Sequence, residues 1–277
     1  MKNLFLLVAS AASLAAQITP IPEPQNLSTL FPSAAIVPPG SVQSDDVVFP
    51  HFAFGGGWNT TLVIANMSLQ TVTFDQYFVD QLGNPLPVTF QTIPGGQIIT
   101  TTSAHGVLQP NSSFNIVLFD PGPGSVLQIG WSFLVYDSTH SRLGGFSIFQ
   151  NALSFGTFEA LVPLSGNDDY KFYMPFDNRA PFATSIAIAN PGTTPTTVTF
   201  TFRDTKGNLL ANVIENVAAG NQQAFALSSI APEIDGFAGT VYVAGSTRTL
   251  SALGFRFNLL SYAFATVPIM NWAGMFP

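Results

Sequence analysis

The sequence predicts an all-β protein made of two tandem antiparallel β-sandwich domains, Ig-like in type, that arose by internal duplication. Residues 52–66 reappear in altered form as residues 176–190, and the offset of 124 positions continues without a gap through 80–84 and 204–208. Between turns rich in Gly, Pro and Asn, short runs alternate apolar and polar residues with the period of two that is typical of a strand. About seven such runs per copy, each bounded by turn residues, predict a sandwich in each half.

The chain divides into five segments by composition and by the extent of the repeat. The expected segments are a signal peptide (1–16), a Pro-rich leader or linker (17–46), the first β-sandwich repeat (47–165), the second repeat (171–270) and a tail (271–277). Proline fixes φ and lacks an amide donor, so the leader is expected to be extended instead of joining a sheet.

The first 16 residues indicate export. One lysine, Lys2, precedes a short apolar run that ends in small residues at Ala15 and Ala16, as in a secretory signal peptide. The run is too short to span a bilayer, which takes about 20 apolar residues, and no later segment is apolar for long enough. We therefore expect no transmembrane helix and a location outside the cell, at its surface or in the periplasm.

Composition excludes several classes of protein. The chain has no cysteine, so disulfides cannot hold it together, and its core must do so. Hydrophobic residues make up 47% and charged residues only 8%, with 26 phenylalanines, which is unlike a disordered chain. A net charge of −7 with eight basic residues argues against a nucleic-acid partner.

Individual strands can be predicted from the alternation. In residues 198–204, Val198, Phe200 and Phe202 fall on one face. The corresponding run 74–80 of the first copy has phenylalanine at its first and last inward positions and Gln76 in place of Phe200. A single helical turn fits residues 227–231. Further strands are expected at 98–102, 113–119, 127–136, 145–149 and 158–162 in the first copy, and at 222–227, 239–243, 250–257 and 263–267 in the second.

The polar residues that both copies keep are typical of turns. Asp80-x-x-Gly83-Asn84 recurs at 204–208, and although Asp and Asn invite a calcium site, calcium needs six to eight oxygen ligands. We expect instead a hairpin with a bulge, in which Asp accepts backbone hydrogen bonds and Gly supplies a positive φ. Asn66 and Asn190 end the repeated strand and are expected to cap its exit.

Two tryptophans are the candidate ligand-binding residues. Trp58 follows three glycines, as a mobile loop that presents an aromatic to a sugar would, but the second copy has Phe182 there without the glycines. An aromatic kept while its surroundings change also fits a core residue at a strand start, so both interpretations stay open. Trp272, in the tail, is the tryptophan most expected to be exposed, whereas Trp131 lies mid-strand and is expected to be buried.

The sequence predicts no catalytic residues, no metal ligands and no cofactor. The three histidines, His51, His105 and His140, all lie in the first copy, and none forms a metal-spaced pair. No G-x-S-x-G nucleophile elbow is present. We therefore expect a non-enzymatic protein.

The repeated front resembles a known group of proteins. Residues 49–63, with Pro50-His51-Phe52-Ala53, three glycines and Trp58-x-Thr-Thr, and the closing motif at 254–258 are similar to uncharacterised secreted β-repeat proteins of soil bacteria, acidobacterial ones especially. The resemblance spans roughly residues 48–270. It implies export and a bacterial origin, and it implies no activity or site.

The leading expectation is an exported, non-enzymatic protein with a structural or adhesion role at the cell surface or outside the cell. Its partner would be a polysaccharide or a cell-surface protein. A carbohydrate-binding module is the first alternative, and an outer-membrane β-barrel is the second. The barrel would need strands of about 9 to 11 residues, and most runs here are shorter.

Overall fold

The computed structural model describes residues 47–93, 96–119, 125–153, 156–164 and 170–271. Over these ranges the protein is all-β, and its strands form several antiparallel sheets, which confirms the predicted class. The two helices found there, α1 (Leu227–Ile230) and the 3-10 helix η2 (Pro232–Ile234), are both far too short to cross a membrane. The predicted signal peptide, the leader and residues 272–277 of the tail lie outside the described residues.

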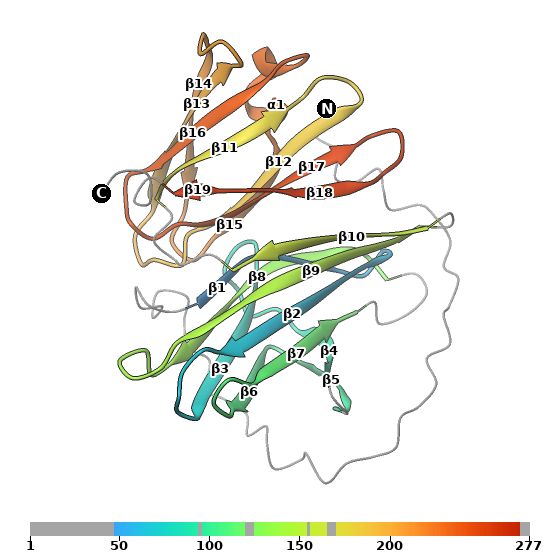
Figure 1. The fold of residues 1–277 in the computed structure, drawn as a ribbon, viewed down its shortest axis with the longest axis vertical. Helices are drawn as coiled ribbons and strands as arrows, with labels where there is room; N and C mark the ends of the chain where they lie inside the picture. Colours follow the sequence, from blue (N-terminus) through green and yellow to red (C-terminus); the bar gives the residue numbers. More distant parts are fainter. Residues whose placement is uncertain (1–46, 94–95, 120–124, 154–155, 165–169, 272–277) are drawn as a thin grey trace.

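The first half of the described chain forms two sheets that pack face to face. Sheet A has the order β1-β8-β3-β6, and sheet B has the order β10-β9-β2-β7-β4-β5. Figure 1 shows this sandwich as the lower half of the molecule. Its strands are β1 (Val47–Phe54), β2 (Trp58–Asn66), β3 (Val72–Asp80), β4 (Val88–Ile93), β5 (Ile98–Thr101), β6 (Ser103–Leu108), β7 (Ser113–Leu118), β8 (Gln128–Tyr136), β9 (Leu143–Leu153) and β10 (Gly156–Pro163).

The second half forms two further sheets, above the first in Figure 1. Sheet C has the order β14-β13-β16-β11-β19, and sheet D has the order β15-β12-β17-β18. Its strands are β11 (Lys171–Asp177), β12 (Phe182–Ala189), β13 (Thr196–Asp204), β14 (Leu209–Val217), β15 (Gln222–Ala226), β16 (Ala238–Gly245), β17 (Ser251–Asn258), β18 (Phe264–Val267) and β19 (Met270–Asn271).

The two sandwiches have the same strand order over their common strands. β1, β2 and β3 begin 124 residues before β11, β12 and β13. With these strands matched, β1-β8-β3-β6 corresponds to β11-β16-β13-β14, and β10-β9-β2-β7 corresponds to β18-β17-β12-β15. The first sandwich adds β4 and β5 at one edge of sheet B, and the second adds β19 beside β11.

Each sandwich has its own aromatic-rich core between its sheets. Alternate residues of the strands point inward, as the period-two pattern predicts, so that Phe74 and Phe78 of β3 and Phe200 and Phe202 of β13 are fully buried. The helical turn expected at 227–231 is α1, and its Leu227 is buried in the core of the second sandwich. All the strands predicted from the alternation are present, and β1, β4, β6, β11, β14 and β19 are additional.

The Asp-x-x-Gly-Asn segments are tight turns, as predicted. Asp80 Oδ1 accepts hydrogen bonds from the backbone N–H groups of Leu82 and Asn84, both at 2.8 Å, and Asp80 Oδ2 accepts one from Asn84 Nδ2 at 3.0 Å. Gly83 has a φ of +81°. The second copy repeats these bonds around Asp204, and a bulge follows in the β13–β14 pairing.

Asn66 and Asn190 do more than cap a strand. Asn190 is fully buried, and its Nδ2 donates to the carbonyl oxygens of Thr194, Val217 and Ala218 at 2.9 to 3.2 Å. Its Oδ1 accepts from Gly192 N at 3.1 Å. Asn66 makes the corresponding set of bonds in the first sandwich. Each asparagine therefore ties the exit of its strand to the end of a second strand, β6 or β14.

Gln76 occupies a core position and has a specific partner there. Gln76 Nε2 donates to Ser132 Oγ of the adjacent strand β8 at 3.0 Å, and both side chains are fully buried. The second sandwich has Phe200 and Val241 at the matching positions. The first core therefore has a hydrogen-bonded polar pair where the second core has an apolar pair. The Oε1 of Gln76 has no hydrogen-bond partner among the described residues.

The two sandwiches pack extensively against each other. Sheet D lies along β1 and β10, the edge strands of sheets A and B. One interface cluster joins Phe149 and Val162 of the first sandwich to Phe255 and Phe264 of the second. A second cluster packs Trp131 and its neighbours on sheet A against the end of β12. The predicted burial of Trp131 is confirmed, and the contact across the interface explains it.

Candidate binding cavity between the sandwiches

The three glycines before Trp58 form a tight β-hairpin turn. Gly55 N donates to Trp58 O at 3.0 Å, and Trp58 N donates to Gly55 O at 3.1 Å. The two central residues, Gly56 and Gly57, have φ of +59° and +89°, which a two-residue turn between twisted strands requires. The turn therefore fixes the start of β2 and holds the Trp58 backbone in place.

This turn also packs closely on the segment before β8. A Cβ on Gly55 would lie 2.6 Å from the carbonyl oxygen of Val126, and Gly56 N donates to Ser125 Oγ at 3.1 Å. Only glycine fits at such a distance. The glycines of the first copy are thus explained by the close approach of this segment.

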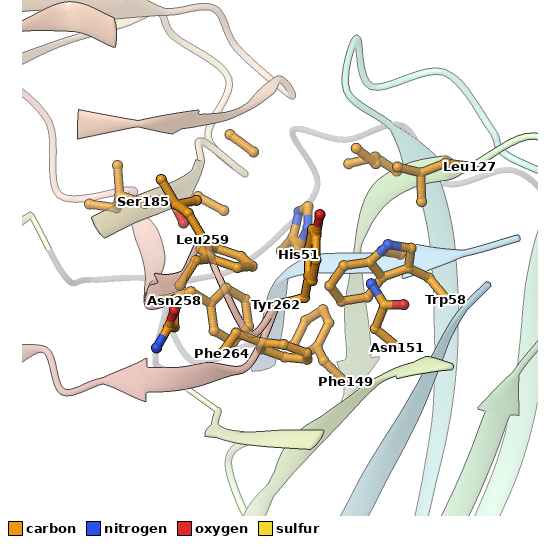
Figure 2. A pocket seen from close by; sticks show the side chains of 17 residues that line it. His51, Trp58, Leu127, Phe149, Asn151, Ser185, Asn258, Leu259, Tyr262 and Phe264 are labelled. Carbon is orange, nitrogen blue, oxygen red and sulfur yellow. The ribbon is translucent and has the colours of Figure 1, made fainter. Parts of the chain in front are cut away.

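Trp58 faces a cavity that both sandwiches build. Its indole is half-buried and packs on Phe264 of β18, with 5.3 Å between ring centroids. The cavity has a volume of about 280 Å³, and Figure 2 shows aromatic rings from both halves converging on it. Its walls come from β1, β2, β8 and β9 on one side and from β12, β15, β17 and β18 on the other, and no Asp, Glu, Lys or Arg is among its lining residues.

A bulge in β1 brings His51 to this cavity. Pairing with β8 is regular up to Phe49 and resumes at Phe52, so one extra residue is accommodated between them. The bulge lets both phenylalanines enter the first core although they are three residues apart. His51 is left beside the cavity, stacked on Phe149 with 5.7 Å between centroids.

His51 connects the two sandwiches by a buried hydrogen bond. Gln222 Nε2 of β15 donates to His51 Nδ1 at 2.7 Å, and Gln222 N donates to Gln81 O at 2.9 Å. Burial without a charged partner lowers the pKa of His51 from 6.5 to about 4. The imidazole is therefore neutral at physiological pH.

Asn151 of β9 supplies a second polar group on the wall. It sits opposite Trp58 in the β2–β9 pairing and is 4% exposed. Its Oδ1 is buried and has no hydrogen-bond partner within the described ranges. A buried carboxamide oxygen in this state is unusual, because most buried polar atoms are paired.

The turn between β17 and β18 forms the outer rim. Asn258 Oδ1 accepts hydrogen bonds from Leu260 N at 3.0 Å and Ser261 N at 3.2 Å, which fixes the turn. Leu259 and Tyr262 line the cavity and are also 45% and 48% exposed. Because the same two residues touch both cavity and solvent, the cavity reaches the surface at this turn.

The matching position in the second sandwich, Phe182, has different surroundings. The guanidinium of Arg256 covers the ring of Phe182 at 3.5 Å from its centroid, and it also donates to Asp177 Oδ2 at 2.9 Å. Hydrogen bonds from Arg179 first, and from Arg256, lower the pKa of Asp177 to about 2, against the opposing effect of burial. Phe182 is thus held within an ion-pair cluster.

The remaining sequence candidates fall elsewhere. Trp272 lies outside the described residues. His105 pairs with Asp75 across strands β3 and β6 at 2.8 Å, and His140 lies 3.4 Å from Asp137 in an exposed turn. Within the described ranges no group of three or more His, Asp or Glu side chains could hold a metal ion.

No family model, curated protein or solved structure matches this chain. The cavity must therefore be interpreted from its own residues. The sequence pointed to Trp58 as a candidate, but it did not predict that His51, Asn151, Tyr262 and Phe264 line the same cavity. The one available signal was that the glycines and His51 occur in the first copy alone.

Proposed function

We propose that the protein is exported and non-enzymatic, and that two Ig-like sandwiches related by duplication serve a structural or adhesion role at the cell surface or outside the cell. The common strand order of the two sandwiches supports the duplication. The matching hydrogen bonds of Asp80 and Asp204, and of Asn66 and Asn190, support it further. The signal-like first 16 residues support export.

The observation that carries the structural role is the packing between the sandwiches. Two apolar clusters and the buried His51–Gln222 hydrogen bond join them, so the pair behaves as one body instead of two domains on a flexible tether. A rigid, charge-poor body of this kind suits a spacer or an adhesive module in an external medium, where salt weakens charge-based contacts.

Cell fractionation with mass spectrometry of the recovered protein tests export. We expect the protein in the medium, in the periplasm or on the surface, with a mature chain that starts near Gln17. Recovery of the full-length chain from the cytoplasm alone would overturn this part of the proposal.

A pull-down from cell-envelope extract, a glycan array and a panel of hydrolase substrates test the role. We expect retention of a surface protein or polysaccharide and no turnover on the panel. Turnover that survives repurification would refute the non-enzymatic role.

The carbohydrate-binding alternative is less well supported by the geometry. Sugar sites combine an accessible aromatic face with several hydrogen-bonding groups, whereas Trp58 is half-buried against Phe264 in a cavity walled mainly by rings. Trp58→Ala should therefore leave retention on polysaccharide affinity gels unchanged. A loss of retention in this variant would restore the sugar-binding interpretation.

A further inference from the structure

We propose that the cavity between the sandwiches binds a small, neutral, largely apolar molecule of about two rings that carries one hydrogen-bond donor such as a hydroxyl. This inference goes beyond the structural role proposed above and does not depend on it. It rests on the size of the cavity, on its walls, on the buried oxygen of Asn151 and on the opening at the β17–β18 turn.

The size of the cavity sets the size of the ligand. At about 280 Å³ it is far larger than the voids that ordinary packing leaves, which seldom exceed a water molecule. An apolar cavity of roughly 150 Å³ accepts benzene, so this one has room for roughly two fused rings. It lies near the lower end of small-molecule sites.

The residues that line the cavity determine the polarity of the ligand. Phe149 and Phe255 meet edge to face with centroids 5.0 Å apart, and Phe255 meets Phe264 in the same way at 5.7 Å. Together with Trp58 these rings offer faces and edges against which an aromatic ligand packs favourably. An ionised ligand would lose its hydration without gaining a charged partner, because the lining residues include none.

Asn151 adds one polar requirement. Its buried Oδ1 lacks a partner among the described residues, and leaving such an acceptor unpaired disfavours the empty state. Rotation of the carboxamide about its Cβ–Cγ bond turns Oδ1 toward the cavity, where a hydroxyl on the ligand satisfies it beside Trp58. Figure 2 shows the Asn151 carboxamide and the Trp58 indole side by side.

The ligand has a way in at the β17–β18 turn. Leu259 and Tyr262 combine cavity contact with nearly half-exposed side chains, and Leu260 beside them is 79% exposed. The same three residues make the mouth apolar, which favours capture of an apolar solute from water.

Isothermal titration calorimetry with 2-naphthol as the ligand tests the site. We expect saturable one-to-one binding with a Kd on the order of micromolar to 1 mM, as befits so small a ligand. Ala224→Phe adds a ring to the cavity wall and should weaken binding by at least about tenfold. Ala218→Phe adds the same ring at an exposed position and should bind as the wild type does.

Two results would overturn the proposal. One is the absence of saturable binding to the wild-type protein up to the solubility limit of 2-naphthol. The other is equal affinity in the Ala224→Phe and Ala218→Phe variants. If circular dichroism shows Ala224→Phe to be unfolded, Ala53→Leu fills the cavity from the opposite wall and is judged by the same criterion.

A second probe isolates the hydrogen bond. 2-Methoxynaphthalene has a similar shape but no donor, so it should bind the wild type about three- to tenfold more weakly than 2-naphthol. In Asn151→Leu the two probes should bind equally. An undiminished preference for 2-naphthol in this variant would refute the role assigned to Asn151.

Discussion

His51 should make the stability of the protein fall as the pH drops from 7 to 4. Its folded-state pKa is about 4, against 6.5 in the unfolded chain, so the unfolded state binds the proton more readily. The stability that the neutral imidazole contributes is therefore fully present above pH 6.5 and is lost as the pH falls toward 4. Linkage gives a loss of about 2 kcal/mol at pH 5 and about 3 kcal/mol at pH 4.

Urea denaturation at pH 7.5, 6, 5 and 4 measures this loss. With a typical slope for a chain of this size, 2 kcal/mol corresponds to a fall of about 1 M in the urea midpoint. His51→Phe keeps a ring against Phe149 but cannot titrate, so its stability should change much less over this range. His140→Gln removes an exposed histidine and serves as the matched control, with the pH dependence of the wild type.

The effects of His51 and of the carboxylate Asp177 fall in different pH ranges. Asp177, with its pKa lowered to about 2, contributes stability that is present above about pH 4 and is lost only below that value. Asp177 therefore does not contribute to a loss of stability between pH 7 and pH 5, the range in which we expect the effect of His51. If the wild type and His51→Phe lose stability in parallel between these two pH values, the burial argument is refuted.

Three further changes test the fold. Asn190→Ala should destabilise the protein by about 2 to 4 kcal/mol in urea denaturation, because the carbonyls of Thr194, Val217 and Ala218 lose the donor that a fully buried side chain supplies; a cost below 1 kcal/mol would contradict this. Ser132→Ala should cost about 1 to 3 kcal/mol by leaving the Gln76 amide unpaired, whereas the double variant Gln76→Leu/Ser132→Ala should be close to neutral; additive losses would argue against the pair. Gly55→Ala should lower the melting temperature more than Gly207→Ala, because both have a positive φ but only Gly55 has a carbonyl oxygen 2.6 Å from the added carbon; equal shifts would refute the close approach.

The sequence predicted the strands well where alternation was strong and turn residues marked the ends. β13 is an example, since its inward residues Val198, Phe200 and Phe202 alternate with threonines. The edge strand β14 was missed because its inward and outward residues are less distinct; Ile214, for example, is 64% exposed. Local pattern carries little information about such edge positions, where burial is set by tertiary packing.

The cavity could be predicted only in part. Comparison of the copies pointed to Trp58 and to the glycines, because these differ between copies while the turns do not. Phe264 and Asn151 gave no signal, since they reach Trp58 through the packing of one sandwich on the other and through the β2–β9 pairing. Periodicity within a strand contains nothing about how two finished sandwiches meet.

The short strand β19 has a consequence for self-association. An edge strand with free backbone groups is a template on which another chain can add by hydrogen bonding. Met270 and Asn271 pair with Tyr173 and Phe172, and so occupy part of the outer edge of β11, while sheet D covers the sides of β1 and β10. Three sites at which sheets of neighbouring molecules could join are thus obstructed, which favours a discrete body over an open-ended fibre in a protein with so little surface charge.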